Sequence, residues 1–151
     1  MPSPTPPIDP AQAVSPGLAR RLAAMLYDWL LLFALMLVAT SLITLPLGMP
    51  SGIGLVSFQA FTFILIPAGF FIGFWVRGGQ TLGMRSWRIK LVTESGQPLR
   101  LSSAVLRLLA ALLSLLPCGL GFIWMLFDAD RLAWHDRLSR TRMVMVVARS
   151  K

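Results

Sequence analysis

The chain has 151 residues, of which 56% are hydrophobic and 13% are charged, and its formal net charge is +8. A soluble domain usually carries about 25% charged residues, so this composition argues against a soluble globular protein. The basic residues flank long apolar runs instead of forming one extended basic stripe, which argues against a nucleic-acid-binding protein.

The N-terminal 16 residues are rich in Pro, Ser and Ala and are expected to form a disordered tail. This segment has no Lys or Arg ahead of an apolar core, so it does not resemble a signal peptide. The rest of the chain, residues 17–148, is expected to form one membrane domain.

Two long apolar runs follow the tail. The first, about 18–45, contains a single charged side chain beyond its opening arginines and ends at Pro46. The second, about 54–76, contains none. Since about 20 apolar residues match the thickness of a bilayer core, each run predicts a transmembrane helix, and the uncharged loop between them predicts a turn.

The polar segment after the second run predicts a short β-structure. Residues 86–93 alternate between apolar and polar side chains, which is typical of a strand. Residues 141–148 are rich in β-branched side chains and predict a second strand. Between these segments lies a third apolar region, about 102–127. The predicted fold is therefore an all-α integral membrane protein with a small cytoplasmic β-structure.

The basic residues indicate the topology. All fourteen Lys and Arg lie at the head of the first run or after the second, and the loop between the two runs has none. The positive-inside rule then places the N-terminus in the cytoplasm of a multi-pass plasma-membrane protein. Pro117 and Gly119 interrupt the third region, and its first arm, 103–116, is about 21 Å long, shorter than a ~30 Å bilayer core. A helical hairpin that keeps both strands cytoplasmic is favoured over a third span.

Two charged residues, Asp28 and Arg107, lie inside the apolar runs. Asp28 is seven residues after Arg21, so it lies on nearly the same helix face and about 10 Å further along the axis. A carboxylate there is costly unless it is paired or hydrated. A functional interpretation is that Asp28 binds a cation, a proton or a basic partner. A structural interpretation pairs it with an arginine such as Arg107, one turn inside the third region.

The segment FDADRLAWHDRLSRT combines Asp128, Asp130, His135 and Asp136. Their spacing on a helix does not converge on one face, and interleaved arginines can neutralise the acids, so no metal site is predicted. Cys118 is the only cysteine and has no ligand-type neighbour at metal-binding spacing. Because no catalytic constellation is recognisable, neither enzymatic activity nor a cofactor is expected.

Three stretches in order resemble the RDD family of membrane proteins: RLAAMLYD, GQTLGMRSWRIKLVTESGQPL and LAWHDRLSRTRMV. The resemblance covers about residues 16–147 and carries the characteristic residues of the family onto Arg21, Asp28 and Asp136. It implies a membrane protein of a family whose molecular function is largely unknown. Transport of an unidentified ligand has been suggested for the family, and some members are linked to sodium/proton exchange.

Two functional hypotheses follow. The first is transport of an ion or small ligand, in which Asp28 acts inside the membrane and the short chain forms a homo-oligomer. The second is a non-catalytic scaffold or accessory protein whose basic cytoplasmic face binds anionic lipid or a partner protein. In either case, a cytoplasmic C-terminal segment would let Arg21 pair with Asp136.

Overall fold

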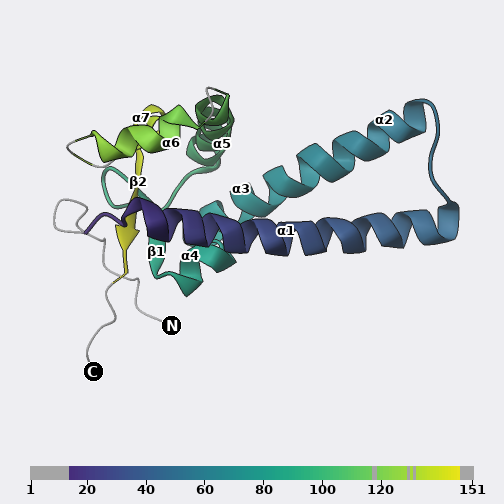
Figure 1. Cartoon of the computed structure of the whole chain (residues 1–151), viewed down its shortest axis with the longest axis horizontal. Coiled ribbons are helices and arrows are strands. Elements are labelled where there is room, and N and C mark those ends of the chain that lie inside the picture. The colour runs from purple at the N-terminus through teal and green to yellow at the C-terminus, as the bar shows by residue number, and fades with distance from the viewer. Residues whose placement is uncertain (1–13, 117–118, 129, 131, 147–151) are drawn as a thin grey trace.

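The structure, a computed structural model, describes residues 14–116, 119–128, 130 and 132–146. Most of the tail predicted for residues 1–16, and the last two residues of the strand predicted at 141–148, lie outside these ranges. The described chain is mainly helical and carries a small two-stranded sheet at one end of a long helical hairpin (Figure 1). We call that end, where α1 begins and α3 ends, the base of the hairpin.

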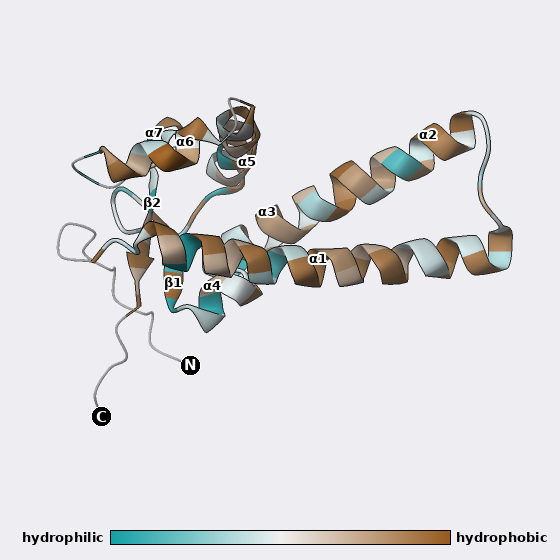
Figure 2. Ribbon diagram, viewed as in Figure 1, coloured by the Kyte–Doolittle hydropathy of each residue, from teal (hydrophilic) through white to brown (hydrophobic). Residues whose placement is uncertain are grey.

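Two long apolar helices form the hairpin. Helix α1 spans Leu18–Leu47, and the second helix, Ile53–Gly78, is built from α2 (Ile53–Ala60), η1 (Phe61–Leu65) and α3 (Ile66–Gly78). Only 6% of the most apolar 18-residue window of each helix is buried, and brown apolar residues cover both (Figure 2). At 1.5 Å per residue each helix exceeds the ~30 Å of a bilayer core. The two predicted long helices are confirmed, to within two residues at each end.

Both helices accommodate a proline. Helix α1 was predicted to stop before Pro46, but it continues through Pro46 to Leu47, and the Gly48 N–H then caps the carbonyl of Thr44 at 2.9 Å. In the second helix, η1 is a π-helical turn just before Pro67. A proline cannot donate to the residue four positions earlier and its ring crowds that carbonyl. A wide turn at this point relieves the crowding without ending the helix.

The two predicted strands pair with each other. Strand β1 (Ile89–Thr93) runs antiparallel to β2 (Thr141–Met145), with Leu91 opposite Met143. The start predicted for the first strand, residue 86, is wrong, because α4 (Leu82–Ser86) occupies that position. The side chain of Thr81 accepts the Met84 N–H at 3.2 Å and starts this helical turn.

The third apolar region is a helical hairpin. Helix α5 (Leu101–Leu115) is followed by α6 (Leu120–Ile123), the 3-10 turn η2 (Trp124–Leu126) and α7 (Trp134–Leu138). Gly121 lies so close to α5 that an added Cβ would be 2.6 Å from the Cβ of Ser114. Figure 1 views α5 nearly end-on while α1 lies across the page, so α5 does not run alongside the long helices.

The core lies at the base of the hairpin, where α1, α3, α4, β1 and α5 meet. It is formed by Ala24, Trp75, Met84, Ile89, Leu91, Leu99 and Ala104. Gly79, directly after α3, links this helix to β1. Its N–H donates to the carbonyl of Trp75 at 2.9 Å, and its own carbonyl accepts the Leu91 N–H at 2.7 Å. Gly79 has φ +68°, which a residue with a Cβ rarely adopts.

We expect Gly79→Ala to destabilise the base and the adjacent Gly78→Ala to leave it nearly unchanged. A Cβ at Gly79 would lie 2.4 Å from Leu91 O in an unfavourable backbone conformation, whereas a Cβ at Gly78 meets nothing within 4 Å. The expected loss for Gly79→Ala is more than about 1 kcal/mol in unfolding free energy. Thermal unfolding of both variants in mild detergent measures this, and equal melting temperatures would refute the packing at Gly79.

Candidate functional site

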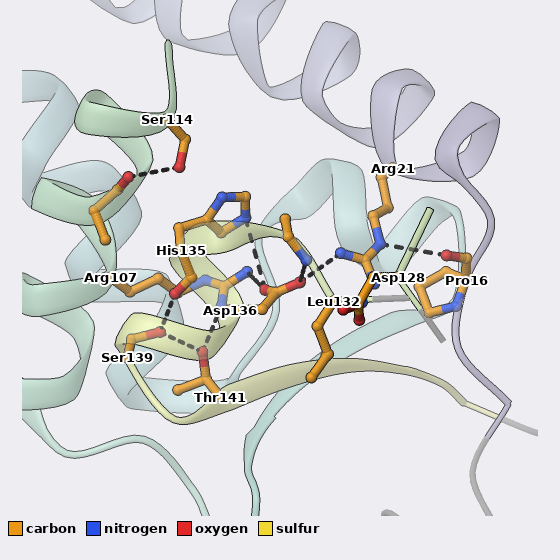
Figure 3. Close-up of polar contacts among 12 residues, drawn as sticks. Pro16, Arg21, Arg107, Ser114, Asp128, Leu132, His135, Asp136, Ser139 and Thr141 are labelled. Atoms are coloured by element: carbon orange, nitrogen blue, oxygen red, sulfur yellow. Dashed lines mark hydrogen bonds and ion pairs between the residues drawn. The ribbon is translucent and has the colours of Figure 1, made fainter. Parts of the chain in front are cut away.

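A buried ionic cluster joins the start of α1 to the C-terminal segment. Asp136, in the first turn of α7, is fully buried. Arg21 Nη1 donates to Asp136 Oδ2 at 2.7 Å, and Arg107 Nη2 lies 2.6 Å from Asp136 Oδ1 (Figure 3). The Ala133 N–H also donates to Oδ2, at 3.1 Å. We call Arg21, Arg107, His135 and Asp136 the Asp136 cluster.

Each arginine of the cluster is held by further contacts. Arg21 Nε donates to the carbonyl of Pro16 at 3.3 Å. Arg107 Nη1 donates to the Thr141 hydroxyl, which lies 2.7 Å from the Ser139 hydroxyl. The guanidinium carbon of Arg107 is also 5.7 Å from the centroid of the Trp75 ring, within cation–π range. Through these contacts the cluster ties α1, α3, α5, α7 and β2 together.

Asp136 is held in its ionised form. Burial alone would raise the pKa of its carboxyl, but the charges of Arg107 and Arg21 outweigh burial and hold that pKa well below its usual range. Removing one partner of a buried ion pair typically costs about 3–5 kcal/mol, because the other charge is left buried and uncompensated. The Asp136 cluster therefore strongly favours one arrangement of the helices and strand that it joins, whether or not the ion pairs add to the overall stability.

His135 is neutral at physiological pH. Burial, followed by the nearby Arg107 charge, lowers the pKa of its imidazole to about 3, although the Asp136 carboxylate acts in the opposite direction. Its Nε2 atom lies 3.6 Å from Asp136 Oδ1, which is too long for a hydrogen bond. The imidazole packs on Phe122 instead, with 4.5 Å between the ring centroids.

Asp28 lies in a second polar site two turns further along α1. It does not contact Arg107, so the suggested Asp28–Arg107 pairing is wrong; Arg107 points to Asp136 because α5 packs against α7. The Thr81 hydroxyl donates to Asp28 Oδ2 at 2.5 Å, and the Gly83 N–H donates to Oδ1 at 2.9 Å. The carboxylate thus holds the first turn of α4 against α1.

Gly83 permits this close approach of α4 to α1. A Cβ at Gly83 would lie 2.2 Å from the carbonyl oxygen of Ala24 and 2.9 Å from the carboxyl carbon of Asp28. Neither Gly83 nor Thr81 was singled out from the sequence. The available signal was the Thr81 side chain, a favoured N-cap residue directly before a short helix.

The remaining acids of the C-terminal segment serve local structure. Asp128 accepts the Leu132 N–H at 2.9 Å and pairs with Arg137 Nη2 at 2.5 Å. Asp130 is 3.8 Å from the same guanidinium. Within the part of the chain that the structure describes, no three His, Cys, Asp or Glu side chains are grouped so that they could hold a metal ion.

The fold and the two sites together define a class of protein: a helical chain with two long apolar helices, a two-stranded sheet at their base, and buried acids contacting Arg21 and the start of α4. The family model for the RDD family matches residues 15–140. This chain belongs to the RDD family. No curated protein and no solved structure matches it.

A double-mutant cycle tests the Arg21–Asp136 contact. We expect Arg21→Gln and Asp136→Asn each to lower the unfolding free energy by about 3–5 kcal/mol, and the double variant to lose less than the sum. A neutral cycle is preferable to charge reversal, because an arginine introduced at 136 would face Arg107. The matched control is Arg137→Gln, which removes an ion pair whose guanidinium is about half exposed and should cost less than either substitution in the Arg21–Asp136 pair. Additive losses would refute the coupling.

Burial of neutral His135 predicts a specific pH dependence. The unfolded chain protonates this histidine near pH 6.5 and the folded chain only near pH 3, so the unfolded state binds more protons between those values. Stability should therefore fall as the pH drops below 6.5, with a slope approaching about 1.4 kcal/mol per pH unit. Loss through Asp136 begins only near the unfolded carboxyl pKa, about 3.9.

Melting temperatures of wild type and His135→Gln between pH 7.5 and 4.5 measure this effect. His135 is the only histidine in the chain, so the variant should lose most of the slope in that window. Parallel pH profiles for the two proteins would contradict the buried neutral state of His135.

Proposed function

We propose that this chain is an integral protein of the plasma membrane with a cytoplasmic N-terminus. In this proposal α1 and the Ile53–Gly78 helix cross the bilayer as a hairpin, and the loop at 48–52 faces outward. The length and exposure of the two helices support the crossing. The distribution of Lys and Arg, which avoid that loop, supports the orientation.

We further propose that it acts as a non-catalytic membrane scaffold or accessory protein. The observation that carries this proposal is the Asp136 cluster, which fastens α5, α7 and β2 to the first turn of α1. Both oxygens of Asp136 face arginines and both oxygens of Asp28 accept protein donors. Carboxylates paired in this way suit a rigid basic module at the membrane surface, where the module can engage anionic lipid or a partner protein.

A second candidate function, ion transport, is favoured by one feature of Asp28. The donors that reach its carboxylate, among the residues described, are the neutral Thr81 hydroxyl and Gly83 N–H. A buried acid of this kind in an apolar helix is the usual group for proton or sodium exchange. Two spans do not enclose a pathway, so this function also requires a homo-oligomer.

Single-cysteine labelling tests the proposed topology. Cys118 is the only native cysteine, so Cys118→Ser provides a clean background. In that background, Met49→Cys should react with a membrane-impermeant maleimide in intact cells, because Met49 is exposed in the outer loop. Ser95→Cys should react only after permeabilisation. The opposite pattern would overturn the orientation.

The Asp28→Asn variant distinguishes the scaffold function from the transport function. In proteoliposomes, a scaffold should show no cation-driven proton flux, and the variant should melt earlier because one hydrogen bond to α4 is lost. A transporter should show flux that Asp28→Asn abolishes at an unchanged melting temperature. Thr81→Val is the control that keeps the carboxylate: it removes the same hydrogen bond, together with the N-cap of α4, so it should melt earlier but leave any flux through Asp28 in place.

A further inference from the structure

A groove of about 280 Å³ lies at the base of the second helix, away from the Asp136 cluster. Its walls combine an apolar half from α3 with a polar half from the end of α3 and from α4. The lining residues are Gly69, Phe70, Gly73, Phe74, Arg77, Gly78, Gln80 and Arg85.

Two glycines on one face of α3 keep the groove open. A Cβ at Gly69 would meet nothing within 4 Å. A Cβ at Gly73 would meet only Arg77 Nη1, at 3.9 Å, so the Arg77 guanidinium lies back along the helix over Gly73. Phe70 and Phe74, with ring centroids 5.0 Å apart, form a continuous aromatic wall beside this face.

Two guanidinium groups occupy the polar half. Arg77 and Arg85 are both exposed. Within the described ranges, neither Arg77 nor Arg85 is in an ion pair with an acidic side chain. Two unneutralised arginines converging on one hollow are a recurrent arrangement for binding phosphate.

We propose that this groove binds one anionic phospholipid. Its phosphate lies between Arg77 and Arg85, and an acyl chain runs along α3 past Phe74 and Gly73 toward Gly69. This inference rests on the proposed membrane insertion, which puts Arg77 at the cytoplasmic boundary and Gly69 about 12 Å deeper. A site that is basic at the boundary and apolar below it matches the two ends of a phospholipid.

The Gly69–Gly73 spacing also resembles the small-residue face on which transmembrane helices dimerise. A second copy seated here through the same face would bring its own Arg77 and Arg85 against the first pair. Four like charges would then meet in a partly desolvated groove, which is unfavourable. Charge complementarity therefore favours a lipid phosphate over a second copy.

The test uses the full chain in mild detergent, titrated with phosphatidylglycerol or phosphatidylcholine and monitored by native mass spectrometry and melting temperature. Wild type should retain one phosphatidylglycerol. The variant Arg77→Gln/Arg85→Gln should bind it roughly 10- to 30-fold more weakly, as expected for the loss of two basic contacts. Gly69→Leu, which fills the groove without changing charge and favours the helix, should also weaken binding.

The matched control is Arg20→Gln/Arg100→Gln, which removes two exposed arginines outside the groove and should change binding less than twofold. If both double variants bound phosphatidylglycerol equally weakly, the effect would come from general surface charge, and the proposed site would be overturned. Displacement of the lipid by millimolar inorganic phosphate would also overturn the lipid site and assign the groove to phosphate ions. A wild-type dimer that Gly69→Leu dissociates would assign the groove to a second copy.

Carbonate extraction of membranes distinguishes failure of this inference from failure of the proposed function. Release of wild type from the membrane would overturn membrane insertion and the lipid site together. Retention in the membrane, with equal lipid binding by wild type and Arg77→Gln/Arg85→Gln, would overturn the lipid site alone.

Discussion

The carboxylate of Asp136 is the interaction on which the base of this molecule depends. It is fully buried, and each of its oxygens faces an arginine from a different helix. A buried charge of this kind is tolerated only while its partners stay in place. The position of α7 relative to α1 and α5 is therefore set by electrostatics as much as by apolar contact.

Asp28 is also a buried carboxylate, but its partners are neutral hydrogen-bond donors. Its carboxylate faces the start of α4, where the Thr81 hydroxyl and the Gly83 N–H donate to it. The two acids thus attach two separate parts of the chain to the first three turns of α1. The remainder of α1 carries mainly exposed apolar side chains, so polar attachment and apolar exposure occupy different stretches of one helix (Figure 2).

Features that depend on local composition could be predicted from the sequence. The long apolar runs predicted both helices, and alternating or β-branched segments predicted both strands. The positive-inside rule placed Arg21 and Asp136 on one side, and they are in contact. The partners of Arg107 and Asp28 could not be predicted, because they depend on how α5 packs against α7 and on the short helix α4. A five-residue helix that begins at a threonine cap gives too weak a periodic signal to be told from a strand.

The contact between Arg21 and Asp136 joins residues 115 positions apart in the chain. At typical synthesis rates of about 5–20 residues per second, Asp136 leaves the ribosome roughly 6–23 s after Arg21. During that interval α1 is already made, but Arg21 lacks the acid that neutralises it in the finished structure. The base of the hairpin is therefore completed late, and a chain interrupted before α7 would leave Arg21 and Arg107 without their shared counter-ion.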